Sequence, residues 1–408
     1  MQETRQSAMP RMMIFALILI SMCGPTGMNI ILPSISSYQV AFETDYATAQ
    51  LTLTFYLAAV AIAQLIYGPL SDRFGRLPII YFGLSGFVVG SVLCLLAQSV
   101  EMLLVGRIVQ AFGGCAGMVM GRAMVRDKYS AEQATSVIAY MTMAIVLAPT
   151  LGPALGGVLE DFYGWRSSYV FVVVMGTLVL LVVSRSLQET LPVNRRQTTH
   201  FKGMIKSFGY LLGNAKFNAY AFMVAFSTSA YFAFLGGSSY VLIDLMGATA
   251  SELGLYFVEV SAFYILGNYL TARLSTRFGV NRLIALGTVL CLSGASMMVF
   301  YGYTAEHTHF TFIAMMSVIA FGNGFCVSSG MASAIGADPA RVGAASGLAG
   351  FMQIGFGSLA TLIVGSLFTV FPDTSMPLLL TVFGCCAISL FSFAFGQWWA
   401  HRGDRVLA

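Results

Sequence analysis

Long apolar stretches separated by short polar connections dominate the chain. Each stretch is close to the roughly 20 residues that a helix needs to cross a bilayer, and backbone groups in lipid must be satisfied within such a helix. The pattern predicts twelve spans. We place them at residues 12–35, 48–70, 77–98, 102–125, 134–158, 168–188, 217–240, 253–272, 282–302, 310–335, 343–370 and 377–399.

The composition strengthens this interpretation. Of 408 residues, 57% are hydrophobic and only 9% are charged, whereas soluble domains carry about 25% charged residues. A large soluble enzyme is therefore excluded, and we expect an all-α polytopic membrane protein. The first apolar run, 12–35, is too long for the hydrophobic part of a signal peptide, so we interpret it as the first span.

The basic residues predict the orientation. If the chain starts in the cytoplasm, all 21 Lys and Arg residues fall at cytoplasmic ends or loops except Arg107, within a span, and Arg166, in an external loop. Cytoplasmic loops carry an excess of Lys and Arg. We therefore expect both termini inside.

A sequence repeat divides the chain. LSDRFGR at 70–76 returns as LSTRFGV at 274–280, after the second helix of each half. The longest polar connection, about 189–216, lies between the halves. We expect an N-terminal six-helix bundle (1–188), a cytoplasmic linker (189–216) and a C-terminal six-helix bundle (217–408), and parallel six-helix repeats are the architecture of major facilitator transporters.

Several motifs carry a resemblance to that superfamily. They are GPLSDRFGRLPII (68–80), LLVGRIVQAFGG (103–114) and APTLGPALGG (148–157), together with RAMVRD (122–127) and GWRSSYVF (164–171). The set resembles the bicyclomycin-resistance branch of the twelve-helix drug:H+ antiporters. The resemblance implies two pseudo-symmetric bundles, alternating access, and export of small amphipathic compounds in exchange for H+ across a bacterial inner membrane.

The first motif predicts a cytoplasmic latch between the halves. Its members are Gly68, Asp72, Arg73, Gly75, Arg76 and Asp127. In the family, the aspartate faces the N-terminus of the eleventh helix, near Gly343 here, where a helix dipole favours an anion. A loop arginine pairs with an acid at the end of the fourth helix, which maps to Asp127. The simpler interpretation, a topology anchor, also holds but does not explain Asp72.

The fifth-helix motif predicts a gating helix. Pro149 and Pro153 each remove a backbone hydrogen bond and favour a kink. Gly152, Gly156 and Gly157 permit close approach of another helix. A helix that only packs would explain the glycines but not the two prolines.

Two positions bear on proton coupling. Arg107 lies within the fourth span, where a charged group is a functional hypothesis by default; the alternative is a side chain that reaches the outer surface. In the first span, the branch commonly has an aspartate before Leu-Pro, whereas MNIILPSI places Asn29 there. An amide cannot take up a proton near neutral pH, so the usual proton carrier is absent from its usual position.

Glu259 is the candidate replacement. It lies in LGLYFVEVSAFYILG, about six residues into the eighth span. Desolvation would favour its neutral form, as a proton-exchanging cavity residue requires. The alternatives are a glutamate at the external headgroup level and a structural partner of Arg107.

The other intramembrane polar and aromatic residues are candidates for the substrate cavity, although helix packing alone is the simpler role for each. They are Asn29, Tyr56, Gln64, Gln110, Tyr140, Tyr231, Phe232, Phe234, Asn323 and Gln353. With 32 Phe and 23 Met, the chain can line an adaptable apolar cavity.

The sequence favours no other chemistry. Its seven cysteines lie in apolar runs without metal-ligand spacing, and no phosphate loop, zinc motif or catalytic triad is present. We expect no enzyme activity, cofactor, metal or nucleic-acid partner, and a monomer in the bilayer. A transporter of a metabolite or siderophore remains the main alternative, ahead of a non-transporting receptor or a membrane enzyme.

Overall fold

The computed structural model describes residues 11–129, 131–196, 201–304 and 308–406, and every regular element in these ranges is a helix. The N-terminal elements are α1 (Arg11–Asn29), η1 (Leu32–Ser34), α2 (Ile35–Ala41), α3 (Tyr46–Phe74), α4 (Arg76–Leu95), α5 (Val100–Lys128), α6 (Ala131–Tyr163) and α7 (Arg166–Ser186). Then follow η2 (Val193–Arg195), α8 (Phe201–Leu212), α9 (Ala215–Ser239), η3 (Tyr240–Leu245), α10 (Ala250–Phe278), α11 (Val280–Thr304), α12 (His309–Ile335), η4 (Pro339–Arg341), α13 (Val342–Val370) and α14 (Met376–Val406).

Eleven helical stretches in the described ranges are long and apolar enough to cross a membrane. The remaining long helix, α6, has 33 residues and packs against α1 of its own half and α10 of the other half. The expected fold of twelve membrane helices in two six-helix halves is therefore confirmed. Most helices extend a few residues beyond the predicted spans, because hydropathy detects the apolar part of a helix and not its polar ends.

The sequence repeat is also a structural repeat. Helices α3 and α10 have 29 residues each and end at Gly75 and Gly279. Both glycines have positive φ angles, +101° and +82°, which a residue with a Cβ rarely adopts. Their N–H groups donate to Ser71 and Ser275 at 2.9 and 3.0 Å. The two copies of the motif thus build the same sharp turn.

The first predicted span is not continuous. Helix α1 ends at Asn29, and the chain resumes through η1 into the short helix α2. The reason is Pro33, because a proline ring clashes with the carbonyl four residues earlier, which is that of Asn29. The break lies in the N-terminal half, where η1 contacts α6, α9 and α10.

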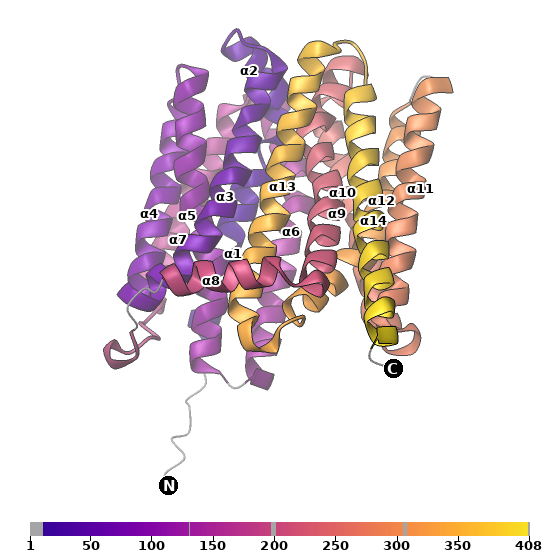
Figure 1. The fold of residues 1–408 in the computed structure, drawn as a ribbon. Helices are drawn as coiled ribbons and strands as arrows, with labels where there is room; N and C mark the ends of the chain where they lie inside the picture. Colours follow the sequence, from indigo (N-terminus) through magenta and orange to yellow (C-terminus); the bar gives the residue numbers. More distant parts are fainter. Residues whose placement is uncertain (1–10, 130, 197–200, 305–307, 407–408) are drawn as a thin grey trace.

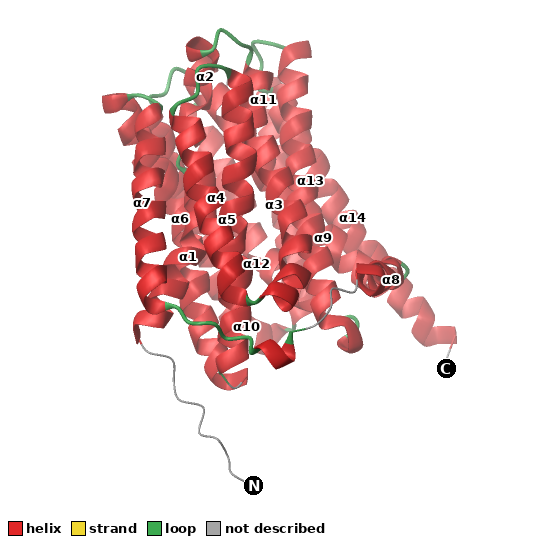
Figure 2. Cartoon of the chain, turned by 90° about the vertical axis from the view of Figure 1, so that its left-hand side faces the viewer, coloured by secondary structure: helices red, strands yellow, loops and turns green. Residues whose placement is uncertain are grey.

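The connection between the halves holds a further helix, α8. It crosses one end of the bundle, whereas α2 lies at the opposite end (Figures 1 and 2). We call these the α8 end and the α2 end. Helix α8 contacts α9 and α13, and the Arg341 guanidinium stacks 3.9 Å from the Tyr210 ring centre. Its apolar residues recur every three to four positions, a pattern typical of a helix lying in the membrane interface.

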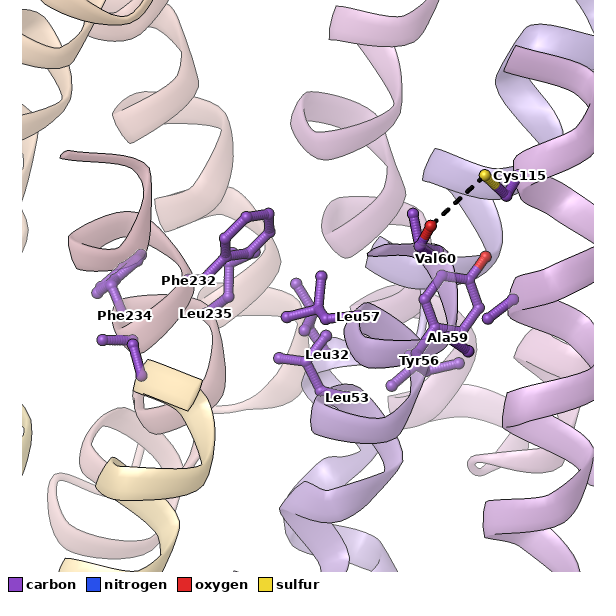
Figure 3. Packing of buried hydrophobic residues seen from close by; sticks show 14 of the residues in the cluster. Leu32, Leu53, Tyr56, Leu57, Ala59, Val60, Cys115, Phe232, Phe234 and Leu235 are labelled. Carbon is purple, nitrogen blue, oxygen red and sulfur yellow. Dashed lines mark hydrogen bonds between the residues drawn. The ribbon is translucent and has the colours of Figure 1, made fainter. Parts of the chain in front are cut away.

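The halves meet along two helix pairs, α3 with α13 and α6 with α10. Buried side chains from both halves form a single apolar core. Figure 3 shows this continuity. Phe232 and Leu235 of α9 lie on one side, Tyr56 of α3 lies on the other, and the leucines between them are Leu32, Leu53 and Leu57.

Candidate functional site at the seam between the halves

Direct hydrogen bonds join α3 to the C-terminal half near the α2 end. The Tyr46 hydroxyl donates to the Gly236 carbonyl at 2.7 Å, and the Gln50 amide donates to Thr361 at 2.6 Å. The Thr54 and Thr361 hydroxyls lie 2.8 Å apart. All of these groups are buried, so this part of the seam is closed.

Helix α6 closes the second part of the seam. A Cβ built on Gly156 would meet the Ile30 carbonyl oxygen at 1.8 Å, and one on Gly157 would meet the Ala250 carbonyl oxygen at 2.2 Å. Gly156 therefore lets α6 contact the break after α1, and Gly157 lets it contact the start of α10. From α10, Gly254 packs equally closely on the Pro153 carbonyl, where a Cβ would stand 2.5 Å away.

The seam is looser toward the α8 end. A Cβ added to Gly68 on α3, or to Gly343 or Gly347 on α13, would meet nothing within 4 Å. The structure is therefore closed at the α2 end, with open space around these helices at the α8 end.

The predicted latch residues gather around Arg76. Its guanidinium lies 2.7 Å from Asp72 and 3.1 Å from Asp127, so both acids contact one arginine. These contacts stay within the N-terminal half, and Arg73 instead stacks on Phe74 at 5.1 Å. The expected arginine–Asp127 proximity is present, whereas a role in latching the halves stays a prediction.

Sequence reasoning missed Glu189 in this cluster. Its carboxylate accepts the backbone N–H groups of Arg76 and Leu77 at 3.0 and 3.2 Å. An anion at the first turn of α4 offsets the helix dipole. No local pattern reveals this role, because more than a hundred residues separate Glu189 from the turn that it caps.

Arg107 lies at the centre of a buried network in the N-terminal half. It donates to the carbonyls of Gly27 (2.7 Å) and Thr52 (3.3 Å) and to the Gln110 side chain (2.5 Å). The guanidinium also stacks 4.2 Å from the ring centre of Tyr56. The side chain is fully buried, so it does not reach the outer surface.

Asn29 lies beside this network, at the last residue of α1. Its amide nitrogen donates to the Pro25 carbonyl at 2.8 Å, whereas its Oδ1 is buried without a protein partner. One guanidinium nitrogen of Arg107, Nη2, is also buried and unpartnered. Both atoms are buried polar groups without a protein partner among the described residues, which is uncommon in folded proteins.

Glu259 lies on α10, where its helix neighbours are partly exposed. Its side chain is exposed, as are Leu255, Phe263 and Leu266 nearby on α10. Arg107 forms no ion pair with a carboxylate in the described ranges, and the alternative of a structural Glu259–Arg107 pair is therefore wrong. The proton role of Glu259 stays a prediction.

The cavity candidates divide into separate groups. Gln353 donates to Thr228 at 3.0 Å, and the Gln64 Oε1 atom lies 2.7 Å from where a Cβ on Gly350 would stand. Asn323 accepts from Ser227 within the C-terminal half. Phe234 stacks on Phe257 and Phe312 in the core, as the packing alternative expects.

The aromatic candidates on α9 and the tyrosine of α6 also differ in their surroundings. The Phe232 ring packs closely on Gly357, because a Cβ on that glycine would lie 2.2 Å from the ring. The ring centres of Tyr231 and Phe232 are 6.2 Å apart. Tyr140 stands apart, 58% exposed. A groove of about 530 Å³ opens between α9 and α14 at the α8 end, lined by Phe222, Phe391, Phe395 and Trp399, and it lies outside the seam.

Known proteins resemble the chain over nearly its whole length. It is 28% identical to a bicyclomycin resistance protein homolog of Haemophilus influenzae, covering 94% of this chain and 95% of that protein. It is 27% identical to multidrug resistance protein D of Escherichia coli, with 97% and 98% covered.

Solved structures share the fold. A bacterial homolog of the human lysosomal transporter Spinster, in an inward-facing and unoccupied conformation, superposes with a TM-score of 0.73 at 15% identity, covering 97% of each chain. A D-xylose–proton symporter superposes with a TM-score of 0.71 at 16% identity, covering 94% of this chain and 96% of the symporter. The family model of the Major Facilitator Superfamily matches residues 17–361. With its two repeated six-helix halves and its paired seam helices, the chain belongs to the major facilitator superfamily.

Proposed function

We propose that the protein exports small amphipathic compounds, drugs among them, in exchange for H+ by alternating access. The observation that carries the proposal is the asymmetric seam, which is closed by α3 and α6 at the α2 end and open around Gly68 and Gly343 at the α8 end. Rocking of one half against the other would reverse this asymmetry. The resemblance to bicyclomycin and multidrug resistance proteins supports drugs as substrates.

The α8 end is the cytoplasmic end in this proposal, with both termini inside a bacterial inner membrane. Arg73, Arg76, Arg277 and Lys128 lie at helix ends there, as a cytoplasmic excess of basic residues requires. The closed α2 end then faces outward, and the structure corresponds to an inward-facing state. In this proposal α6, whose motif resembles the fifth helix of exporters, forms part of the outward closure.

Reconstituted vesicles test the proposal. The purified full chain is incorporated into proteoliposomes with a pH-sensitive dye inside, and candidate drugs are added against an imposed proton gradient. Drug-dependent proton movement that a protonophore abolishes is the expected result. A drug-susceptibility panel in an efflux-deficient host, with and without protonophore, should give the same spectrum. Proton fluxes equal to those of protein-free vesicles for every compound would contradict the proposal.

Glu259 and Arg107 are the proposed proton-coupling residues. Glu259 is the one acid within the predicted spans, and this supports its assignment. In the vesicle assay, Glu259→Gln should abolish proton-driven transport with normal expression. Glu252→Gln, in the first turn of the same helix, is the matched control. Unchanged transport with unchanged pH dependence would rule Glu259 out.

A transporter of a metabolite or siderophore with atypical coupling is the second candidate function. Asn29 favours it, because the amide replaces the acid expected at that position. The same vesicles distinguish the two functions: drug-independent proton release on adding a metabolite would favour the second.

A further inference from the structure

An unpredicted carboxylate, Glu160, lies at the α2 end between α6 and the broken first helix. The hydroxyls of Ser34 and Ser37 donate to its two oxygens, one to each, with 2.5 Å between the Ser37 hydroxyl and Oε1. Both serines belong to the segment of η1 and α2 that follows the break after α1. Glu160 is half-buried, and no ion pair reaches it in the described part of the chain.

The same segment of η1 and α2 also forms hydrogen bonds with the C-terminal half. Ser36 lies 2.9 Å from Ser239, and Ser36 and Gln39 donate to Asp244 at 3.1 and 2.9 Å. Along η1 and α2, residues 34 and 37 therefore bind α6, whereas residues 36 and 39 bind the C-terminal half. The segment bridges the two halves, and Glu160 fixes its N-terminal side.

The surroundings of Glu160 depend on closure at the α2 end. One residue later, Asp161 accepts the backbone N–H of Ser251 at 2.9 Å, and Gly157 lies against Ala250. Separation of α6 from α10 would break these contacts and admit water to Glu160. In the closed state the carboxylate is half-buried, and we expect it to be more hydrated when the α2 end opens.

We propose that Glu160 is a proton-binding gate residue, whose protonation stabilises closure of the α2 end. This inference rests on the proposed H+-coupled export and adds a proton site to it. Burial without a cation disfavours the charged form. A proton therefore binds the closed state more tightly than the open one, and by linkage it shifts the population toward closure.

The charged groups around Glu160 form no ion pair with it. Asp161, the next residue on α6, is an acid, and Tyr38 on α2 pairs with the Tyr169 hydroxyl at 3.0 Å. The Arg107 guanidinium instead donates to the Gly27 and Thr52 carbonyls and to Gln110. Arg166 of α7 stacks on Trp165 and donates to the Ala97 carbonyl. Acids near one another reinforce the neutral form of the most buried one.

Distances between spin labels at the α2 end test the proposal in the full-length protein. Leu96, at the end of α4, is 60% exposed, and Tyr303, near the end of α11, is 71% exposed. The seven native cysteines are buried, so labels on Leu96→Cys and Tyr303→Cys report the separation of the halves. Lowering the pH from about 8 to about 5 should increase the short-distance population several-fold. Glu160→Gln should keep that population high at both pH values.

Two further variants distinguish a proton site from a structural contact. Ser34→Ala with Ser37→Ala removes donors that favour the charged form, so the midpoint pH of the transition should rise. Glu101→Gln, an acid in the first turn of α5 at the same end, should behave as the wild type. A Glu160→Gln variant with the wild-type pH response, or a wild type without any pH response, would overturn the proposal. The distance measurement needs no substrate, so it can be made even if drug export fails in the vesicle assay. Drug transport without a pH-dependent label distance would contradict the Glu160 proposal but not the proposed export.

Discussion

At the scale of single residues, the most unusual position is a charged side chain buried in the protein interior. Arg107 is the fully buried cation of the described chain, and its partners are carbonyls and an amide instead of an acid. A charge in a dry interior is costly unless its hydrogen-bonding capacity is used. The network therefore holds α1, α3 and α5 together as well as setting the local polarity.

Replacing Arg107 by Ala should destabilise the protein. The change leaves the Gly27 carbonyl, in the last turn of α1, and the Gln110 side chain short of a donor, and each buried unsatisfied group costs about 1–3 kcal/mol. The melting temperature in detergent should fall by several degrees. Arg273→Ala, which removes an exposed side chain stacked on Tyr269, should change stability by less than about 0.5 kcal/mol. Equal melting temperatures for the two variants would contradict this structural role.

At the scale of elements, close approach explains why α6 carries its glycines. Two of its faces touch backbone, one at Ile30 and the other at Ala250. Any Cβ at these contacts forces the helix away from its neighbours. The residues that resemble the fifth-helix motif of exporters thus form close contacts between the halves at the α2 end.

Gly156→Ala should prevent this seating. The added Cβ would lie 1.8 Å from the Ile30 oxygen, and overpacking a tight contact typically costs about 1–3 kcal/mol. We expect a lower melting temperature and a larger label separation at the α2 end. Gly347→Ala, where a Cβ meets open space, should be neutral or stabilising by up to about 1 kcal/mol. A normal label separation in Gly156→Ala would refute the seating role.

At the scale of the whole molecule, the two ends of the seam oppose each other. Closure at the α2 end leaves Asp72 paired with Arg76 and half-exposed, with open space around Gly343 at the start of α13. Closure of the α8 end would bring that helix N-terminus toward Asp72, where a dipole stabilises an anion. The latch is therefore a proposal about the alternate state.

Asp72→Asn should shift the equilibrium toward closure of the α2 end. A charge–dipole contact is worth about 0.3–1 kcal/mol, which corresponds to a change of up to about fivefold in the ratio of the two states. The Leu96 and Tyr303 label pair measures that ratio at fixed pH. A ratio equal to that of the Glu101→Gln control would show that Asp72 does not latch the halves.

By itself, the sequence determined the twelve membrane helices, the two halves and the repeat at the ends of α3 and α10. These features follow from local hydropathy, from basic residues at helix ends and from glycines in a repeated motif. Only the tertiary structure decided what each polar residue contacts. Glu259 lies on an exposed face, Glu189 caps a distant helix, and Glu160 accepts hydroxyls from η1 and α2. The physical reason is that burial and hydrogen bonding depend on which helix faces meet, and residues more than a hundred positions apart decide that jointly.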